Sequence, residues 1–165
     1  MILLPGDPAI SGHADNAHVP RRLREYWPTY LRRSGLPAGP MPERRAQFAR
    51  YQQVTRRLHE AGVRLLVGTD APEPNVPPRL ALHQELELLV ACGLSPAQAL
   101  SAATLENARA LQQSDHLGSI AEGKLADLVL LRANPLAAIR SSRSIELVVR
   151  GGIVCDPAAL LRRVP

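Results

Sequence analysis

The most informative part of this chain is the stretch Arg64-Leu65-Leu66-Val67-Gly68-Thr69-Asp70-Ala71-Pro72. Its short apolar run ends at Gly-Thr-Asp and a proline-rich loop follows, which is the pattern of a buried strand with one carboxylate at its C-terminal tip. Parallel α/β proteins collect their active sites at the C-terminal ends of strands. Asp70 is therefore a candidate for chemistry, although an Asp at this place can equally cap a turn or the next helix.

Length and composition limit the classes of protein to which the chain can belong. Its 165 residues suit one domain, or one domain with a small appendage. No apolar run is long enough to span a membrane and the first residues do not resemble a secretory signal, so we expect a cytoplasmic protein with no membrane partner. The net charge is +5, but the arginines are scattered among glutamates and aromatic residues make up only 3% of the chain, so we expect no nucleic-acid partner.

The region before this stretch is predicted to be mainly helical. Ile2–Leu4 is a possible short strand. A helix is predicted over Val19–Arg33, with Pro28 kinking or dividing it. A second, amphipathic helix is predicted over Glu43–Ala61, and Gly62 should end it as a cap with positive φ. Four apolar side chains form one stripe on that second helix: Phe48, Tyr51, Val54 and Leu58.

A helix over Arg79–Cys92 is predicted to follow the Asp70 loop. His83 lies near its start. A histidine on a helix surface is usually inert, but this one is close enough in sequence to Asp70 to reach the same site.

Two short helices are predicted next. The first, Pro96–Ala103, begins with Ser95-Pro96-Ala97-Gln98, which can form a complete capping box. Thr104 can cap the second, Leu105–Leu111.

After residue 113 the pattern changes to short strands. Leu117–Ile120 and Ala126–Leu131 read as strands joined by a glycine turn, and Gly151-Gly152 between two apolar runs is a strong hairpin signal. We therefore predict two units, residues 1–113 and residues 114–165.

Several short motifs follow one another in a specific order: Gly68-Thr69-Asp70, His83-Gln84-Glu85-Leu86, Gly93-Leu94-Ser95-Pro96, Ala103-Thr104 with Asn107-Ala108, Leu117-Gly118-Ser119-Ile120 and Gly123-Lys124-Leu125-Ala126-Asp127. Their order and spacing resemble the C-terminal part of the amidohydrolase superfamily, and most closely its imidazolonepropionase-like and prolidase-like branches. The resemblance extends from about Leu58 to Val154.

The resemblance implies an α/β fold, namely the C-terminal portion of a (β/α)₈ TIM-like barrel followed by a small β-sandwich segment. Val63–Val67 would be the eighth barrel strand, residues 1–113 a partial barrel and residues 114–165 the sandwich segment. It also implies a hydrolase of carbon–nitrogen bonds in cyclic amides or dipeptides. In this family the Asp after strand eight, here Asp70, ligates a divalent metal, most commonly Zn²⁺, and accepts a proton from the metal-bound water. From its place near the Asp70 loop, His83 would be either a neighbour of a metal ligand or a contact to the small-molecule substrate.

The chain also departs from the family pattern. It contains no HxH motif, its single lysine, Lys124, lies in a glycine turn, and one Asp cannot hold a hydrolytic zinc that needs three protein ligands. We therefore expect a fragment that binds little metal and turns over no substrate by itself. Its unpaired strand edges would favour a homo-oligomer or an N-terminal complementing chain. Two alternatives are a non-catalytic remnant or complementing subunit, and an arginine-rich domain that binds anions.

Overall fold

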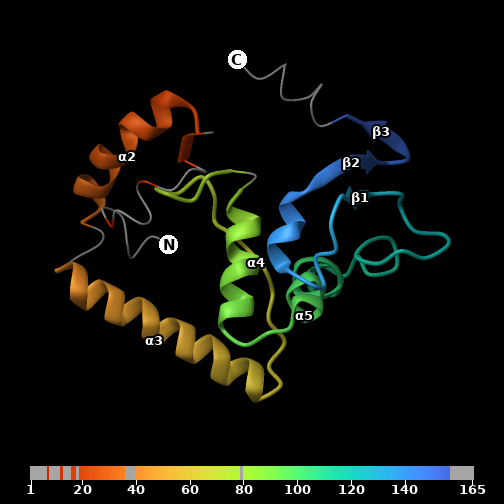
Figure 1. Ribbon diagram of the computed structural model, residues 1–165, viewed down its shortest axis with the longest axis horizontal. Helices are drawn as coiled ribbons and strands as arrows, with labels where there is room; N and C mark the ends of the chain where they lie inside the picture. The colour runs from red at the N-terminus through yellow and green to blue at the C-terminus, as the bar shows by residue number, and fades with distance from the viewer. Residues whose placement is uncertain are drawn as a thin grey trace.

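The computed structural model describes residues 7, 12, 16–17, 19–35, 40–78 and 80–156, and the possible strand Ile2–Leu4 lies outside them. Helices form the first two thirds of the described chain and a small sheet forms the last third (Figure 1). The elements in chain order are α2 (Arg21–Ser34), α3 (Met41–Glu60), α4 (Ala81–Ala91), α5 (Pro96–Ser101), η2 (Ala102–Glu106), α6 (Asn107–Ala110), β1 (Leu128–Leu131), η3 (Ile139–Arg143), β2 (Ile145–Arg150) and β3 (Ile153–Cys155). None of the described helices is long and apolar enough to cross a membrane.

The first two described helices lie close to their predicted positions. Pro28 lies inside α2, which is a single element, so the proline does not divide the helix. α3 ends at the predicted glycine cap. Gly62 has a φ of +76° and donates its N–H to His59 O, and Val63 donates to Leu58 O, which together make a Schellman motif.

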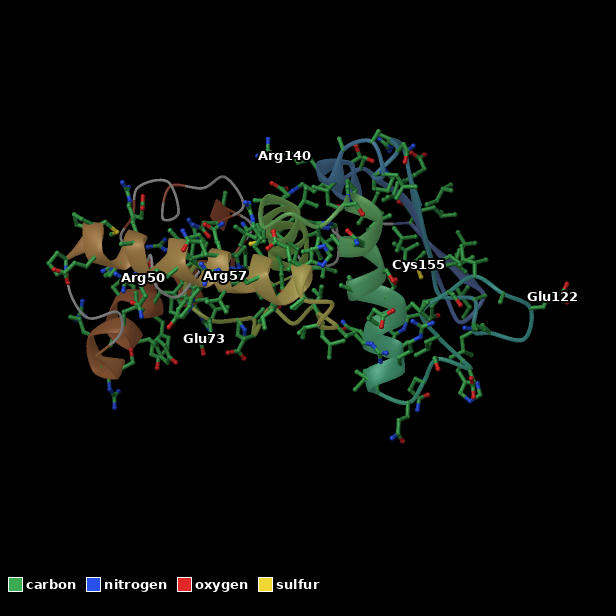
Figure 2. All side chains as sticks on the ribbon, turned by 90° about the horizontal axis from the view of Figure 1, so that it is seen from below. Arg50, Arg57, Glu73, Glu122, Arg140 and Cys155 are labelled. Carbon is green, nitrogen blue, oxygen red and sulfur yellow. The ribbon has the colours of Figure 1, made fainter. Side chains whose placement is uncertain are left out.

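The amphipathic stripe of α3 remains exposed. Tyr51 is 54% exposed, Val54 52% and Leu58 41%, and α3 contributes no buried residue. Arg56 ties the helix to the end of α4 by donating to the carbonyl oxygens of Ala91 and Cys92. Figure 2 shows α3, marked by Arg50 and Arg57, and the loop that carries Glu122 at opposite ends of the molecule. The C-terminal unit therefore does not cover this apolar face.

Residues 63–67 do not form the buried, paired strand that the sequence predicts. The segment has no ladder partner among the described residues. Leu65 and Val67 are half-buried against the core, whereas Val63 and Leu66 between them are 47% and 49% exposed. The prediction is wrong in this respect because an apolar run forms a strand only where another strand offers its backbone groups, and none of the described strands pairs with this segment.

The helices after the segment form the core. Leu86 and Leu89 of α4 pack with Leu94, Ala99 and, from the C-terminal unit, Ile139. The capping box at Ser95 is confirmed: its Oγ accepts from Gln98 N at 3.2 Å, and Gln98 Oε1 accepts from Ser95 N at 2.8 Å.

The predicted division of the next helices at Thr104 is wrong. α5, η2 and α6 follow one another without a break, and η2 is a π-helical turn. Thr104 Oγ1 donates to Leu100 O at 2.7 Å, so its hydroxyl is used within the helix and does not cap a new one.

The C-terminal unit contains one antiparallel sheet in the order β1-β2-β3. The hairpin at Gly151-Gly152 is confirmed, with φ values of +56° and +80°. The predicted strand Leu117–Ile120 is an irregular loop, which Lys124 Nζ fastens through Ser114 O and Ser119 Oγ. The described residues thus contain one small sheet; neither a second sandwich layer nor a barrel strand is present among them. The division at residue 113 stays a prediction.

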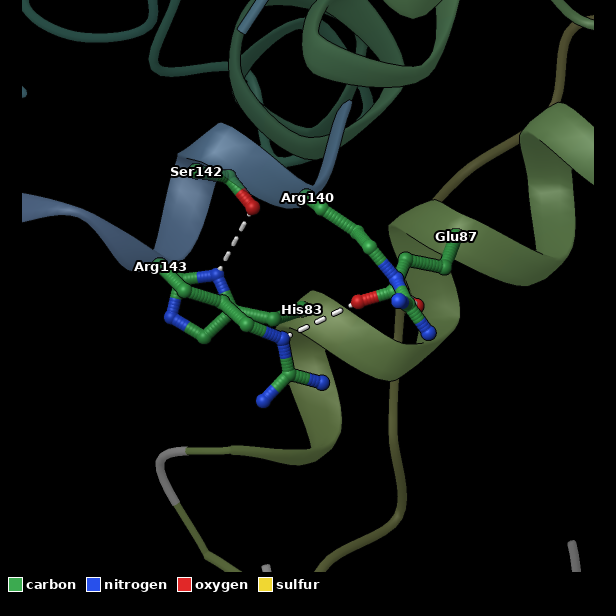
Figure 3. Close-up of polar contacts among 5 residues, drawn as sticks. All are labelled: His83, Glu87, Arg140, Ser142 and Arg143. Atoms are coloured by element: carbon green, nitrogen blue, oxygen red, sulfur yellow. Dashed lines mark hydrogen bonds and ion pairs between the residues drawn. The ribbon is translucent and has the colours of Figure 1, made fainter. Parts of the chain in front are cut away.

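Polar contacts join this unit to α4 (Figure 3). Glu87 accepts from Arg140 Nε at 3.1 Å and from Arg143 Nε at 3.0 Å. Its carboxylate therefore links α4 to both ends of the η3 turn.

Candidate functional site

The backbone just before Asp70 is held by a carboxamide from α6. Asn107 Oδ1 accepts from Val67 N at 3.1 Å, and Asn107 Nδ2 donates to Val67 O at 2.9 Å. A carboxamide has one acceptor and one donor side, like a peptide group. Asn107 therefore satisfies both backbone groups of Val67, which a neighbouring strand would otherwise do.

A carboxylate from α4 holds the next residue. Glu85 Oε1 accepts from Gly68 N at 3.0 Å. Burial raises the pKa of the half-buried Glu85 carboxyl above its ordinary value, and the hydrogen bond from Gly68 opposes this shift. Two helices thus fix consecutive residues of the segment.

Asp70 lies in a left-handed turn at the end of this segment. Its φ is +53°, a conformation that Asp tolerates better than most residues, and the residue is exposed. Asp70 O accepts from Glu73 N at 3.4 Å. Asp70 does not cap α4, whose N-cap residue is Leu80, so the helix-capping alternative is wrong. Asp70 is at a turn, and that alternative stays open.

α2 reaches the loop that follows Asp70. Tyr30 Oη donates to Glu73 Oε1 at 3.3 Å. The negative charge of Glu73 raises the pKa of Tyr30, with a smaller contribution from the charge of Asp70. The hydrogen bond from Tyr30 therefore joins α2 to the loop that follows Asp70.

The structure places His83 against the C-terminal unit. His83 Nδ1 lies 3.0 Å from Oγ of the buried Ser142 in η3 (Figure 3). This contact explains a histidine at the start of α4 in structural terms. Its role as a substrate contact stays a prediction.

The described residues do not fit a complete hydrolytic zinc site. In the part of the chain that the structure describes, no three His, Cys, Asp or Glu side chains are grouped so that they could hold one ion. A catalytic zinc normally has three protein ligands. Asp70 is therefore a single candidate ligand, and the described residues do not supply the other two that such a site needs.

A cavity of about 320 Å³ lies at the other end of the extended segment. It is lined by Val63, Arg64 and Leu65 from the segment and by side chains from α5 to α6. Arg64 and Arg109 both pair with Glu106, at 3.0 Å and 2.6 Å, so much of the charge in this cavity is balanced within the protein. Asp70 does not line it.

No role for Asn107 or Glu85 is predicted from the sequence. Both residues belong to the motifs on which the family resemblance rests, and this membership was the one sign in the sequence that they have a function. Their partners lie 40 and 17 residues away in sequence, so local patterns could not assign them.

Comparison with known proteins places the chain in a family. The model of the amidohydrolase family matches residues 12–154. The imidazolonepropionase of Geobacillus kaustophilus is 35% identical over 105 residues, which are 60% of this chain and 24% of that protein. The imidazolonepropionase of Anaeromyxobacter sp. is 49% identical over 80 residues, which are 46% of this chain and 18% of that protein.

Similar solved structures include a putative prolidase and an amidohydrolase. A putative prolidase from Bifidobacterium longum is 45% identical with a TM-score of 0.58, over 61% of this chain and 25% of that one. Bottromycin amidohydrolase is 25% identical with a TM-score of 0.73, over 97% of this chain and 36% of that one. The chain thus spans about a quarter of the length of the curated relatives it matches. On the match of the family model to most of its residues, this chain belongs to the amidohydrolase family.

Proposed function

We propose that this chain is the C-terminal part of a metal-dependent hydrolase that cleaves carbon–nitrogen bonds in small molecules of the cyclic-amide or dipeptide type. Family membership supports a hydrolase. Relatives named imidazolonepropionase and prolidase support the two substrate types. Asp70 would be the metal-binding carboxylate that this chain contributes, with Zn²⁺ as the metal in the complete enzyme, and His83 a substrate contact.

The observation that carries the proposal is the extended segment that ends at Asp70. One face packs on the core through Leu65 and Val67, while Val63 and Leu66 are about half exposed and no described strand pairs with the backbone. The backbone of residues 64–66, to which no described strand is hydrogen-bonded, is a site for strand addition. We infer that further strands of the complete enzyme lie beside it and supply the other metal ligands.

The exposed stripe of α3 supports the same conclusion. Tyr51, Val54 and Leu58 are each 41–54% exposed on a helix of 20 residues. Burying the exposed half of such a side chain is worth about 1 kcal/mol. A larger protein that covers α3 would therefore be stabilised by about 3 kcal/mol from this stripe alone.

The test compares this chain with a longer one. The DNA upstream of Met1 is read for an in-frame extension, and both proteins are assayed for zinc content and for hydrolysis of dipeptides, N-acyl amino acids and cyclic amides. We expect zinc and turnover only in the longer protein. There, Asp70→Asn should abolish turnover, whereas Asp115→Asn, which removes another exposed carboxylate, should not.

Each other outcome changes the conclusion. Stoichiometric zinc or turnover by the 165-residue chain alone would show that it is not an inactive part. Stop codons directly upstream would favour the alternative, a non-catalytic remnant or a complementing subunit. Native mass measurement in the presence of candidate partner chains would then separate these two, because only a complementing subunit forms a stable complex.

A further inference from the structure

We propose that Glu85 and Asn107 are positioning residues, which replace strand neighbours along Val67 and Gly68 and thereby fix the backbone that presents Asp70. This inference rests on the proposed role of Asp70. The effect of these two side chains on the backbone can be tested whether or not Asp70 binds a metal.

The two side chains act on consecutive residues from different helices. Asn107 occupies both the N–H and the C=O of Val67, at 3.1 Å and 2.9 Å, and Glu85 accepts the N–H of Gly68 at 3.0 Å. Three hydrogen bonds therefore hold two residues of a segment that has no ladder in the described structure. A carboxamide bonded on both sides also resists rotation of the peptide groups that flank Val67.

The held residues are close to Asp70 along the chain. Asp70 follows Gly68 by two residues, a distance of at most about 7 Å along an extended backbone. On its other side, the turn from Asp70 O to Glu73 N and the bond from Tyr30 to Glu73 hold the loop. Asp70 thus lies between two fixed points, and its own exposed carboxylate is free to meet a ligand.

The stability of the helices does not require these bonds. α4 and the helices from α5 to α6 are already joined by the apolar core around Leu86, Leu89 and Ala99. The half-buried position of the Glu85 carboxylate also carries a cost, since partial burial raises its pKa, and a neutral side chain would fill the same space without this cost. The hydrogen bond from Gly68 N–H to Glu85 explains why a carboxylate stands at this position despite that cost.

The test uses the 165-residue chain labelled with ¹⁵N. Glu85→Met and Asn107→Leu keep the approximate volume of each side chain and remove its strong hydrogen-bonding groups. We expect amide hydrogen exchange at Gly68 in the first variant, and at Val67 in the second, to rise about tenfold. Tenfold corresponds to about 1.4 kcal/mol, which lies within the range for the loss of one hydrogen bond. The heteronuclear NOE of Asp70 should fall in both variants.

Conservative variants and a matched control separate positioning from general loosening. Glu85→Gln keeps an acceptor for Gly68 and should restore slow exchange and the NOE of Asp70. Asn107→Asp keeps only the acceptor and should protect the Val67 amide while the NOE of Asp70 stays low. Glu87→Met on the same helix removes the contacts to Arg140 and Arg143 and should leave residues 67–70 unchanged.

Two results would overturn the inference. The first is unchanged exchange at Val67 and Gly68 in the apolar variants, and the second is equal loosening of residues 67–70 in Glu87→Met. If an apolar variant does not fold, the contrast between Asn107→Asp and Glu85→Gln decides, because only the former should lower the NOE of Asp70. These readouts do not depend on turnover, so failure of the proposed hydrolase function would leave them intact.

Discussion

Adding a methyl group at Gly118 should destabilise the protein more than the same change at Gly123. Both glycines have left-handed backbones, with φ of +88° and +83°. A Cβ at Gly118 would lie 2.7 Å from Ala108 Cβ and 2.9 Å from Leu105 Cα, whereas one at Gly123 would meet nothing within 4 Å. The loop therefore touches the η2–α6 helix at Gly118, and this contact has no room for a side chain.

The difference between the two variants isolates the steric clash. An alanine in the left-handed conformation destabilises the folded state by about 1–2 kcal/mol. Replacing glycine also lowers the conformational entropy of the unfolded chain, which offsets about 0.4–1 kcal/mol of this loss. Both values apply equally to the two sites. Only Gly118→Ala adds overpacking of about 1–3 kcal/mol. For a chain of this length, 2 kcal/mol corresponds to a Tm lower by about 6 °C.

Thermal unfolding followed by far-UV circular dichroism would measure this difference, with both variants at the same protein concentration. Equal Tm values for Gly118→Ala and Gly123→Ala would refute the reasoning. That result would mean that the loop moves away from the helix at no cost, and that the close contact does not join the C-terminal unit to the helices.

Three further predictions follow from the polar contacts and the buried thiol. Arg143→Ala should lower the free energy of unfolding by about 1 kcal/mol and Arg140→Ala by less than about 0.5 kcal/mol. Both side chains pair with Glu87, but that of Arg143 is 27% exposed and that of Arg140 is 80% exposed. Urea titration would show which variant loses more stability, and a larger loss in Arg140→Ala would contradict the prediction. Because burial raises the pKa of Glu85 above 4.5, the folded chain binds this proton more tightly than the unfolded chain. The resulting stability is fully present below pH 4.5 and is lost as the pH rises through the raised pKa, and Glu85→Gln should remove this fall in urea midpoints measured from pH 4 to pH 8. Burial also raises the pKa of the Cys92 thiol, so a disulfide reagent at pH 8 should label it slowly until urea unfolds the chain, and rapid labelling of the native protein would be inconsistent with its burial.

Local features were predictable from the sequence. The capping box at Ser95, the glycine end of α3 at Gly62 and the hairpin at Gly151-Gly152 all form where the residue types indicate. Each is specified by residues within five positions of one another, so its energy depends little on the rest of the fold. The order of the motifs likewise predicted the family, which the family model confirms.

Other predictions failed where a distant partner was needed. Residues 63–67 have the composition of a strand, but strand formation requires hydrogen-bonding groups from another strand, and none is present in the described residues. Thr104 is a residue type that often caps helices, but its hydroxyl donates to Leu100 O because the π-helical turn continues the helix. Leu117–Ile120 reads as a strand, but Gly118 packs against a helix and no strand among the described residues pairs with it.

By itself, the sequence determined the approximate positions of α2, α3 and α4, the hairpin, the family and the choice of Asp70 as the candidate ligand. Only the tertiary structure decided how that residue is presented. It brings Asn107 from 40 residues away and Glu85 from 17 residues away onto the backbone before Asp70, and it turns His83 toward Ser142. The physical reason is that local patterns reflect preferences of neighbouring residues, whereas these bonds exist only after the apolar core has packed the helices against the segment.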